Sequence, residues 1–289
     1  MLKTVELTEQ RNTDGGCAML LGGFDGLHLG HRRLLVRAKE SGLPVGVMTI
    51  SGGKETESLF TFREREDVFK RAGADFLFEL PFAEIKNLSG EDFLKMLVRR
   101  FDVKLFVCGE DFRFGAGALG TPALIEQATR VRVEVQSLLE MNGEKVSSTL
   151  IKKRLAAGDA AGAALLLQEP FFLLGEVVRD RGIGRTIGFP TANVRYPKEK
   201  YPLKIGVYET RIEADGAVYK GITNYGARPT FGEEEILTES YLDGFSGELY
   251  GKEIKISFVR FLREVQKFDN PQALRKQLKK DIGSVRGYD

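Results

Sequence analysis

The chain contains 289 residues, of which 42% are hydrophobic and 29% charged, and its 43 basic and 41 acidic residues give a formal net charge of +2. This length and composition predict a folded protein of two domains and exclude a largely disordered chain. The near balance of charge argues against a general nucleic-acid-binding surface, and no apolar run approaches the roughly 18 residues that cross a bilayer, so we expect a cytoplasmic protein with no nucleic-acid or membrane partner.

The first half of the chain alternates between strand-like and helix-like segments. Short apolar runs predict buried strands, and the stretches between them carry apolar residues at helical spacing. Strands separated by helices are typical of a parallel sheet with right-handed crossovers. The predicted strands are 18–24, 44–50, 75–80, 103–108 and 131–138. The predicted helices are 31–41, 63–72, 89–100 and 119–130, followed by a helical stretch at 148–167.

The pattern changes near residue 170. Short β-type segments punctuated by glycine and proline follow, and they predict an antiparallel barrel or sandwich. We therefore expect two domains, 1–169 and 170–289. The predicted strands of the second domain are 173–178, 206–214, 218–223, 236–243 and 252–262, and a helix at 271–282 ends the chain.

Both histidines of the chain lie in one stretch, residues 22–31, between a predicted strand and a predicted helix. Its glycines allow backbone N–H groups to face an anion, and the helix adds its positive N-terminal end. Ligands of open α/β sheets bind at the carboxyl ends of the strands. The stretch therefore predicts a phosphate site where two imidazoles stabilise the charge of a transferring group, and a tight turn with two exposed histidines is the alternative. The candidate residues are Gly23, Phe24, Asp25, Gly26, His28, Gly30 and His31.

Three segments of this half resemble a known family. The pattern Gly23-Phe24-Asp25-Gly26-x-His28-x-Gly30-His31 resembles the motif of the nucleotidyltransferase superfamily that carries a His-x-Gly-His element. Residues 146–152 are similar to its second element, Ser-Ser-Thr-x-Ile-Arg, and residues 109–120 resemble the Gly-x-Asp-Phe-x-Phe-Gly segment of bacterial FAD synthetases. The resemblance covers residues 20–155 and implies a Rossmann-like domain that transfers AMP from ATP to FMN.

The same resemblance implies roles for residues of the second and third segments. Hydroxyl and N–H groups at a helix start would hold the outer phosphates of ATP, and a cationic side chain one turn further on would assist. A helix cap is the alternative for the hydroxyls. Asp111, Phe112 and Phe114 would bind and flank a flavin ring, with core packing as the alternative for each phenylalanine. The phosphate-binding candidates are Ser147, Ser148, Thr149 and Lys152.

The chain departs from the family pattern at two places. Lys152 stands where the family usually has arginine, and lysine keeps the charge but loses the bidentate fork. The segment Ser51-Gly52-Gly53-Lys54-Glu55 stands where the family commonly has proline and histidine. Both differences bear on the adenylylating activity.

A second glycine-rich stretch, residues 182–193, ends in Pro-Thr-Ala-Asn. Small residues permit close backbone approach to phosphates, and neutral oxygen ligands suit a Mg²⁺ ion that keeps most of its contacts to water and ATP phosphates. An ordinary glycine-rich loop is the alternative. The candidate residues are Gly182, Gly184, Arg185, Pro190, Thr191 and Asn193, of which Thr191 and Asn193 are the metal candidates.

With the segments that follow, this stretch closely resembles riboflavin kinases. The segments are 206–208, 224–231, 249–251 and 261–268, and the resemblance covers residues 172–285. It implies a small antiparallel β-barrel, which agrees with the strand-rich pattern. Arg263 either lies near the flavin or faces solvent.

The kinase family uses a glutamate as the base that takes the proton of the flavin's ribityl hydroxyl. The spacing to Leu249-Tyr250-Gly251 places Glu239 in this role. A rival register places Thr238 there, which would leave Glu239 as a solvated surface residue.

The two halves together resemble the bifunctional prokaryotic riboflavin kinase/FAD synthetases. The resemblance implies ATP, riboflavin, FMN and FAD as substrates and products, with Mg²⁺ in both steps. Two alternatives remain: a riboflavin kinase whose first domain is weak or altered in substrate, and a non-catalytic flavin-binding protein. The oligomeric state is open.

Overall fold

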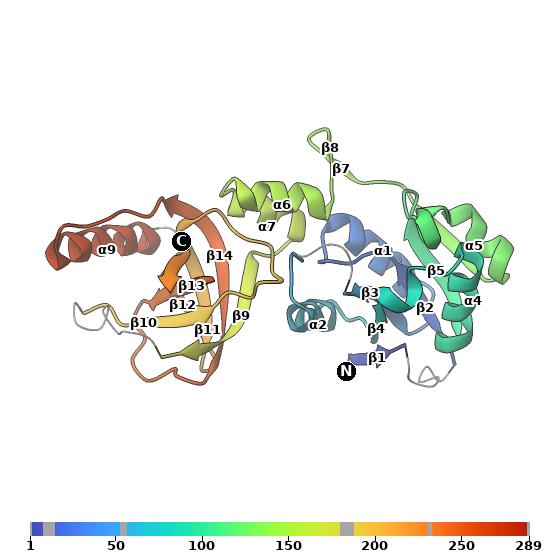
Figure 1. The fold of residues 1–289 in the computed structure, drawn as a ribbon, viewed down its shortest axis with the longest axis horizontal. Helices are drawn as coiled ribbons and strands as arrows, with labels where there is room; N and C mark the ends of the chain where they lie inside the picture. The colour runs from blue at the N-terminus through green and yellow to red at the C-terminus, as the bar shows by residue number, and fades with distance from the viewer. Residues whose placement is uncertain (1, 8–14, 53–56, 180–187, 231–232, 288–289) are drawn as a thin grey trace. The chain divides into compact units, whose positions relative to one another are not determined.

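The computed structural model describes residues 2–7, 15–52, 57–179, 188–230 and 233–287. The chain divides into two compact units, Met1–Leu150 and Ile151–Asp289, and Figure 1 shows the ribbon of each. The boundary predicted between residues 169 and 170 lies between the helix α7 (Ala160–Leu167) and the strand β9 (Phe171–Val178), and it stays a prediction.

The first unit is built on a six-stranded sheet of order β1-β4-β3-β2-β5-β6, in which every pair is parallel. The chain adds β3 and β4 on one side of β2, and β5 and β6 on the other. The strand order therefore reverses at β2, and this is where open α/β sheets bind ligands at the carboxyl ends of their strands. The strands are β1 (Lys3–Glu6), β2 (Cys17–Leu21), β3 (Val45–Ser51), β4 (Phe76–Pro81), β5 (Val103–Gly109) and β6 (Arg132–Gln136).

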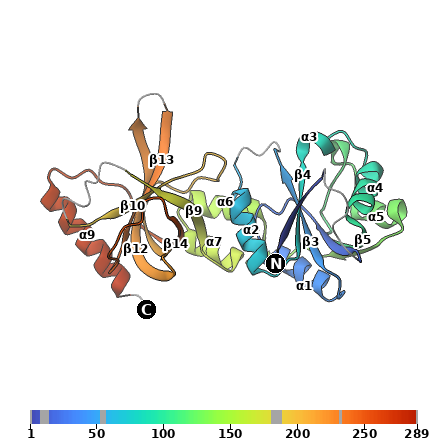
Figure 2. The same cartoon turned by 90° about the horizontal axis from the view of Figure 1, so that it is seen from below.

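Helices cover both faces of this sheet, as Figure 2 shows. A strand that is covered on both faces is apolar along its whole length. The strand β2 is such a strand, since all of its residues are buried. A short hairpin formed by β7 (Glu140–Met141) and β8 (Glu144–Lys145) precedes the last helix of this region. The helices are α1 (Leu29–Lys39), α2 (Phe62–Arg71), α3 (Phe82–Ile85), α4 (Gly90–Phe101), η1 (Ala116–Ala118) and α5 (Pro122–Thr129), and α6 (Ser148–Ala156) runs from the end of this unit into the second.

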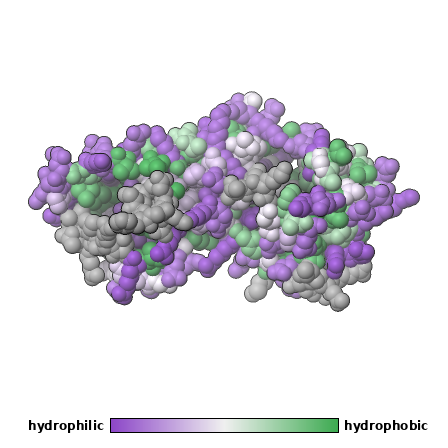
Figure 3. Space-filling view, in the orientation of Figure 1, coloured by the Kyte–Doolittle hydropathy of each residue, from purple (hydrophilic) through white to green (hydrophobic). Residues whose placement is uncertain are grey.

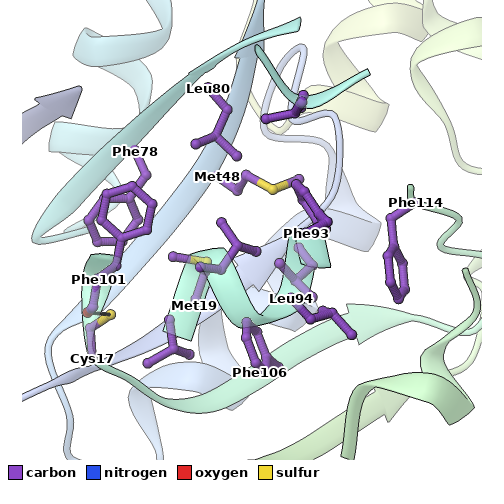
Figure 4. Packing of buried hydrophobic residues seen from close by; sticks show 14 of the residues in the cluster. Cys17, Met19, Met48, Phe78, Leu80, Phe93, Leu94, Phe101, Phe106 and Phe114 are labelled. Atoms are coloured by element: carbon purple, nitrogen blue, oxygen red, sulfur yellow. Dashed lines mark hydrogen bonds between the residues drawn. The ribbon is translucent and has the colours of Figure 1, made fainter. Parts of the chain in front are cut away.

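The core between the sheet and α4 is rich in aromatic and sulfur-containing side chains, which point toward one another in Figure 4. Met19, Met48 and Phe78 come from three adjacent strands, and Phe93 comes from α4. Gly46 makes room for this packing, because a Cβ atom there would lie 2.1 Å from the Phe78 ring. Cys17 and Cys108 are buried free thiols, and burial raises the pKa of each to about 12.

The second unit is a closed antiparallel barrel of order β10-β13-β12-β11-β14-β9. A parallel-sheet domain followed by an antiparallel barrel with a C-terminal helix is the fold class that the sequence predicts, and it is confirmed. The further strands are β10 (Thr191–Arg195), β11 (Gly206–Ala214), β12 (Ala217–Thr230), β13 (Glu233–Leu242) and β14 (Glu253–Arg263), and the helix is α9 (Pro271–Arg286).

The barrel interior holds both aromatic rings and a chain of hydroxyl groups. The Thr223 hydroxyl lies 2.9 Å from that of Thr210 and 2.8 Å from that of Ser240, and all three residues are fully buried. The bonds connect β11, β12 and β13, so these buried polar groups are satisfied inside the barrel. On the outside, Ile282 and Val285 of α9 pack in one apolar cluster with residues of the barrel.

Most predicted elements are present within one to three residues, but some elements of the described residues were missed. These are β1, the one-turn helix α3, the short helix η1, the β7–β8 hairpin and β10. The helical stretch predicted at 148–167 is two helices, since Gly158 adopts a φ of +83° between α6 and α7. Among the described residues no helix has the length and apolarity to span a bilayer, and hydrophilic side chains cover much of the face shown in Figure 3.

Candidate functional site

The glycine-rich loop between β2 and α1 is anchored by Phe24. This residue adopts a positive φ of 38°, and its ring is only 1% exposed. A Cβ atom on Gly22 would lie 2.9 Å from the Phe24 ring, and the ring packs edge-on against Phe69 at 6.1 Å. The buried Phe24 ring therefore supports the loop from the side of the core. Gly23 is exposed and available to a ligand.

Asp25 and Gly26 hold the loop to its surroundings. The Asp25 Oδ1 atom accepts a hydrogen bond from the Leu59 backbone N–H at 2.8 Å. A Cβ atom on Gly26 would lie 3.1 Å from the Phe60 ring, so the close approach favours glycine. Arg65, a buried cation on α2 that the sequence did not single out, lies close enough for Asp25 to favour its charged form, although burial is the larger effect and lowers its pKa.

His28 and His31 form a stacked pair at the start of α1. Their ring centroids lie 3.6 Å apart with the planes 17° from parallel. The His28 Nδ1 atom accepts a hydrogen bond from the His31 backbone N–H at 3.2 Å, which makes His28 the N-cap of α1. The His31 Nδ1 atom lies 2.6 Å from the Gly26 carbonyl oxygen, which can only accept, so Nδ1 of His31 carries a proton.

These bonds fix the tautomer of the pair. Because Nδ1 of His28 is an acceptor, the proton of the neutral ring lies on Nε2. Burial, with the charge of His31, lowers the pKa of His28 to about 2, and burial lowers the pKa of His31 to about 4. Both rings are therefore neutral near pH 7, and Nε2 of His28 carries an N–H donor.

A further cation, Lys145, lies next to the histidine pair. Its ammonium pairs with the carboxylate of Asp111. The charge of Lys145 contributes to the lowered pKa of His28, and that of Asp111 opposes the lowering at His31. Lys145 was missed from the sequence, where the only signal was its position two residues before Ser147.

The hydroxyl segment of residues 147–149 lies against the histidine loop. A Cβ atom on Gly30 would lie 3.2 Å from the His28 ring and 4.0 Å from the Val146 carbonyl oxygen, so Gly30 permits this approach. The Ser147 hydroxyl accepts a hydrogen bond from the Leu150 N–H at 3.3 Å, as a helix cap does. Ser148 is half-buried and Thr149 exposed at the first turn of α6.

Lys152 and Phe114 each lie near aromatic rings. The Lys152 Nζ atom lies 5.6 Å from the centroid of the Tyr201 ring. Phe114 is 6% exposed and belongs to the core, with its ring 5.8 Å from that of Phe93 (Figure 4). Phe112 is only partly buried and lies 5.3 Å from Phe114, so it is the phenylalanine with surface left for a flavin.

In the barrel, three polar residues stand in a row across adjacent strands. Asn193 of β10 is directly opposite Glu239 of β13, and Glu239 is directly opposite Asn224 of β12. Residues opposite one another in antiparallel pairs point to the same face, so the three side chains share the outer face of the barrel. We call Asn193, Glu239 and Asn224 the polar row. Thr191 lies two residues before Asn193 and shares this face.

Two side-chain oxygens of the polar row are buried without a hydrogen-bond partner among the described residues. Within the described part of the chain, Oδ1 of Asn193 and Oδ1 of Asn224 have no hydrogen-bond partner. Asn193 is 4% exposed. The neutral side-chain oxygens of Thr191 and Asn193 suit Mg²⁺, with water and phosphate completing its shell, so these two residues fit that ion.

The structure places Thr238 and Glu239 on opposite faces. Thr238 is fully buried in the barrel, and its hydroxyl donates to the Val194 carbonyl oxygen at 3.0 Å. Glu239 is partly exposed beside Asn193. This register places Glu239, and not Thr238, in the polar row.

The remaining predicted residues do not join this row. Pro190 is exposed just before β10. Arg263 is held by Asp281 of α9, with Nη2 2.8 Å from the carboxylate, so it anchors the helix. Gly182, Gly184 and Arg185 lie outside the described residues, as does most of the loop at 51–55.

Comparisons with known proteins agree with this division of the chain. A family model described as FAD synthetase matches residues 10–150, and one described as riboflavin kinase matches residues 167–288. The bifunctional riboflavin kinase/FMN adenylyltransferase of Haemophilus influenzae is 32% identical over 94% of this chain and 94% of its own. That of Bacillus subtilis is 33% identical over 97% of this chain and 96% of its own.

A solved structure from Streptococcus pneumoniae, described as a macrolide-efflux protein, is also similar over nearly the whole chain. It aligns with a TM-score of 0.90 and 28% identity, and covers 99% of both chains. The similarity shows that the two proteins share a fold.

Proposed function

This chain belongs to the family of bifunctional riboflavin kinase/FMN adenylyltransferases, and we propose that the histidine loop and the polar row are its two catalytic sites. The protein is a transferase that converts riboflavin to FMN and FMN to FAD, with ATP as the donor in both steps. The first unit is proposed to carry the adenylylation and the barrel the phosphorylation. A cytoplasmic location is proposed with them, since ATP is supplied there.

The observation that carries the proposal is the position of Glu239. It stands on the outer face of the barrel, directly opposite Asn193, whose buried Oδ1 has no partner among the described residues. Buried polar atoms are rarely left unsatisfied, so an unsatisfied oxygen beside a carboxylate indicates a ligand site. This is the arrangement that phosphoryl transfer to a hydroxyl requires.

In the kinase step, the terminal ribityl hydroxyl of riboflavin attacks the γ-phosphorus of ATP. Glu239 accepts the hydroxyl proton as the new O–P bond forms, and the bond to ADP breaks. The kinase families use a divalent metal with ATP, generally Mg²⁺. Thr191 and Asn193 would hold it, and it would neutralise phosphate charge.

In the adenylylation step, a phosphate oxygen of FMN attacks the α-phosphorus of ATP and pyrophosphate leaves. The FMN phosphate is already ionised near neutral pH, so this step needs no general base. The neutral His28 donates its Nε2–H to a phosphate oxygen, and backbone N–H groups of the loop stabilise the charge that develops. Ser148 and Thr149, at the first turn of α6, would hold the outer phosphates.

A second candidate is a riboflavin kinase with weak adenylylation, because Lys152 stands where the family usually has arginine and lysine lacks the bidentate fork. Incubating the protein with riboflavin, ATP and Mg²⁺, and separating the flavins, distinguishes the two. FAD is the expected product. Accumulation of FMN alone would support the second candidate, and unchanged riboflavin would contradict both.

A further inference from the structure

Asn224 stands at one end of the polar row with a buried acceptor that nothing in the described chain satisfies. Its Oδ1 atom has no hydrogen-bond partner among the described residues, and its neighbour across the sheet is Glu239. A buried carbonyl oxygen without a donor destabilises the folded state. Its presence beside the proposed base therefore indicates a donor supplied by a ligand.

The neighbours of Asn224 on the same strand form their hydrogen bonds inside the barrel without using the Asn224 Oδ1 atom. Thr223 is satisfied in the interior by Thr210 and Ser240, and the Tyr225 hydroxyl accepts from the Leu203 N–H at 3.2 Å. Both of these side chains are fully buried on the inner face. The unsatisfied oxygen belongs only to the outer face, where Ile222, two residues away, packs in the apolar cluster that includes α9.

The order of residues in the polar row separates the proposed ATP and metal site from the proposed site of the acceptor. Adjacent strands lie about 4.8 Å apart, so Asn193 and Asn224 are separated by about 10 Å with Glu239 between them. Thr191 and Asn193 are on the side proposed to hold ATP and its metal. Asn224 is on the opposite side of the base, where the acceptor molecule must approach.

We propose that Asn224 is a specificity-determining residue for the acceptor, and that its Oδ1 accepts a hydrogen bond from a secondary hydroxyl of the ribityl chain. This rests on the proposed kinase function of the polar row. The ribityl chain carries several hydroxyl donors next to the terminal hydroxyl that reacts. An acceptor beside Glu239 would select a polyhydroxylated chain and align its terminal hydroxyl with the base.

The test is Asn224→Leu, which keeps a similar volume and removes the acceptor. Riboflavin binding is measured by quenching of flavin fluorescence without ATP, and KM values are measured separately for riboflavin and ATP. We expect the Kd and KM for riboflavin to rise about tenfold, with the KM for ATP within about twofold of the wild type. Asn193→Leu is the matched comparison, and it should raise the KM for Mg-ATP instead.

A folding control and a chemical control complete the test. Because the variant removes an unsatisfied buried acceptor, its thermal unfolding midpoint should equal or exceed that of the wild type, and Asn224→Ala serves if leucine does not fit. Riboflavin analogues lacking one secondary ribityl hydroxyl should include one that binds the wild type about tenfold more weakly but binds the Asn224 variant like riboflavin itself.

The outcomes separate this inference from the kinase proposal. If the wild type makes FMN and the Asn224 variants bind riboflavin as tightly as it does, Asn224 has no role in the acceptor site. A rise in the KM for ATP alone would also overturn the inference. If the wild type neither binds nor phosphorylates riboflavin, it is the kinase proposal that fails.

Discussion

The His28 Nδ1 atom accepts the backbone N–H of His31, and the two imidazole rings stack with centroids 3.6 Å apart. One ring thus caps the helix that carries the other. The same hydrogen bond directs the remaining N–H of His28, on Nε2, away from the helix backbone. The helix cap and the proposed phosphate contact therefore use different nitrogen atoms of one side chain.

The two uses of His28 can be separated by substitution. His28→Asn keeps an acceptor for the His31 N–H but loses the Nε2–H donor, whereas His28→Ala loses both. We expect both variants to lower the adenylylation rate about 100-fold or more, and only His28→Ala to lower the free energy of unfolding, by about 1 kcal/mol. Urea denaturation and FAD formation from supplied FMN measure the two effects. Normal adenylylation by His28→Asn would show that the Nε2–H is not used.

The neutral histidine pair predicts a dependence of stability on pH. The folded pKa values, about 2 and about 4, lie below the ordinary value of 6.5, so the unfolded chain binds more protons between these limits. The free energy of unfolding therefore falls as the pH drops below 6.5, until about pH 4 for the contribution of His31 and about pH 2 for that of His28.

Urea denaturation at several pH values, on the wild type and on His28→Asn/His31→Gln, measures this contribution. The double variant should lose less stability between pH 7 and pH 4.5, by on the order of 5 kcal/mol. Parallel curves for the two proteins over this range would contradict the assignment of neutral rings.

Glu239 and Thr238 give a matched pair for the kinase. Glu239→Gln should lower riboflavin phosphorylation about 100-fold or more, because the base is lost while the shape is kept, and adenylylation of supplied FMN should persist. Thr238→Val removes a buried hydrogen bond inside the barrel, so it should lower stability by about 1 kcal/mol and leave kinase turnover nearly unchanged. The reverse pattern would support the rival register.

Phe112 and Phe114 are expected to respond differently to truncation. Phe114→Ala leaves a cavity in the core and should lower the free energy of unfolding by about 3–5 kcal/mol. Phe112→Ala should cost less stability and raise the KM for FMN about fivefold, if its exposed edge contacts the flavin. An unchanged KM for FMN in Phe112→Ala would remove this residue from the flavin site.

The sequence predicted the strands and helices with strong periodicity because burial on one or both faces imposes that periodicity. It missed β10, where only five residues follow a glycine- and proline-containing stretch. It also left open whether Phe112 and Phe114 bind flavin or pack, because the composition of an aromatic segment is the same in both cases. The packing of Phe114 depends on Phe93, in a distant helix.

The polar row shows which part of a site only a fold can reveal. Asn193 and Glu239 were found from motif resemblance, but Asn224 becomes significant only through its register with Glu239. The choice between Glu239 and Thr238 also depends on the strand pairing, since consecutive residues of a strand face opposite sides. Lys145 similarly joins the histidine pair through a hairpin with no helical or strand periodicity of its own.

We propose that one chain carries two separate catalytic sites, and a mixture of two variants tests this. Glu239→Gln and His28→Asn are each incubated with riboflavin, ATP and Mg²⁺, alone and together, and the flavins are separated. We expect unchanged riboflavin for the first variant, FMN for the second, and FAD only for the mixture. FAD formed from riboflavin by either variant alone would contradict it.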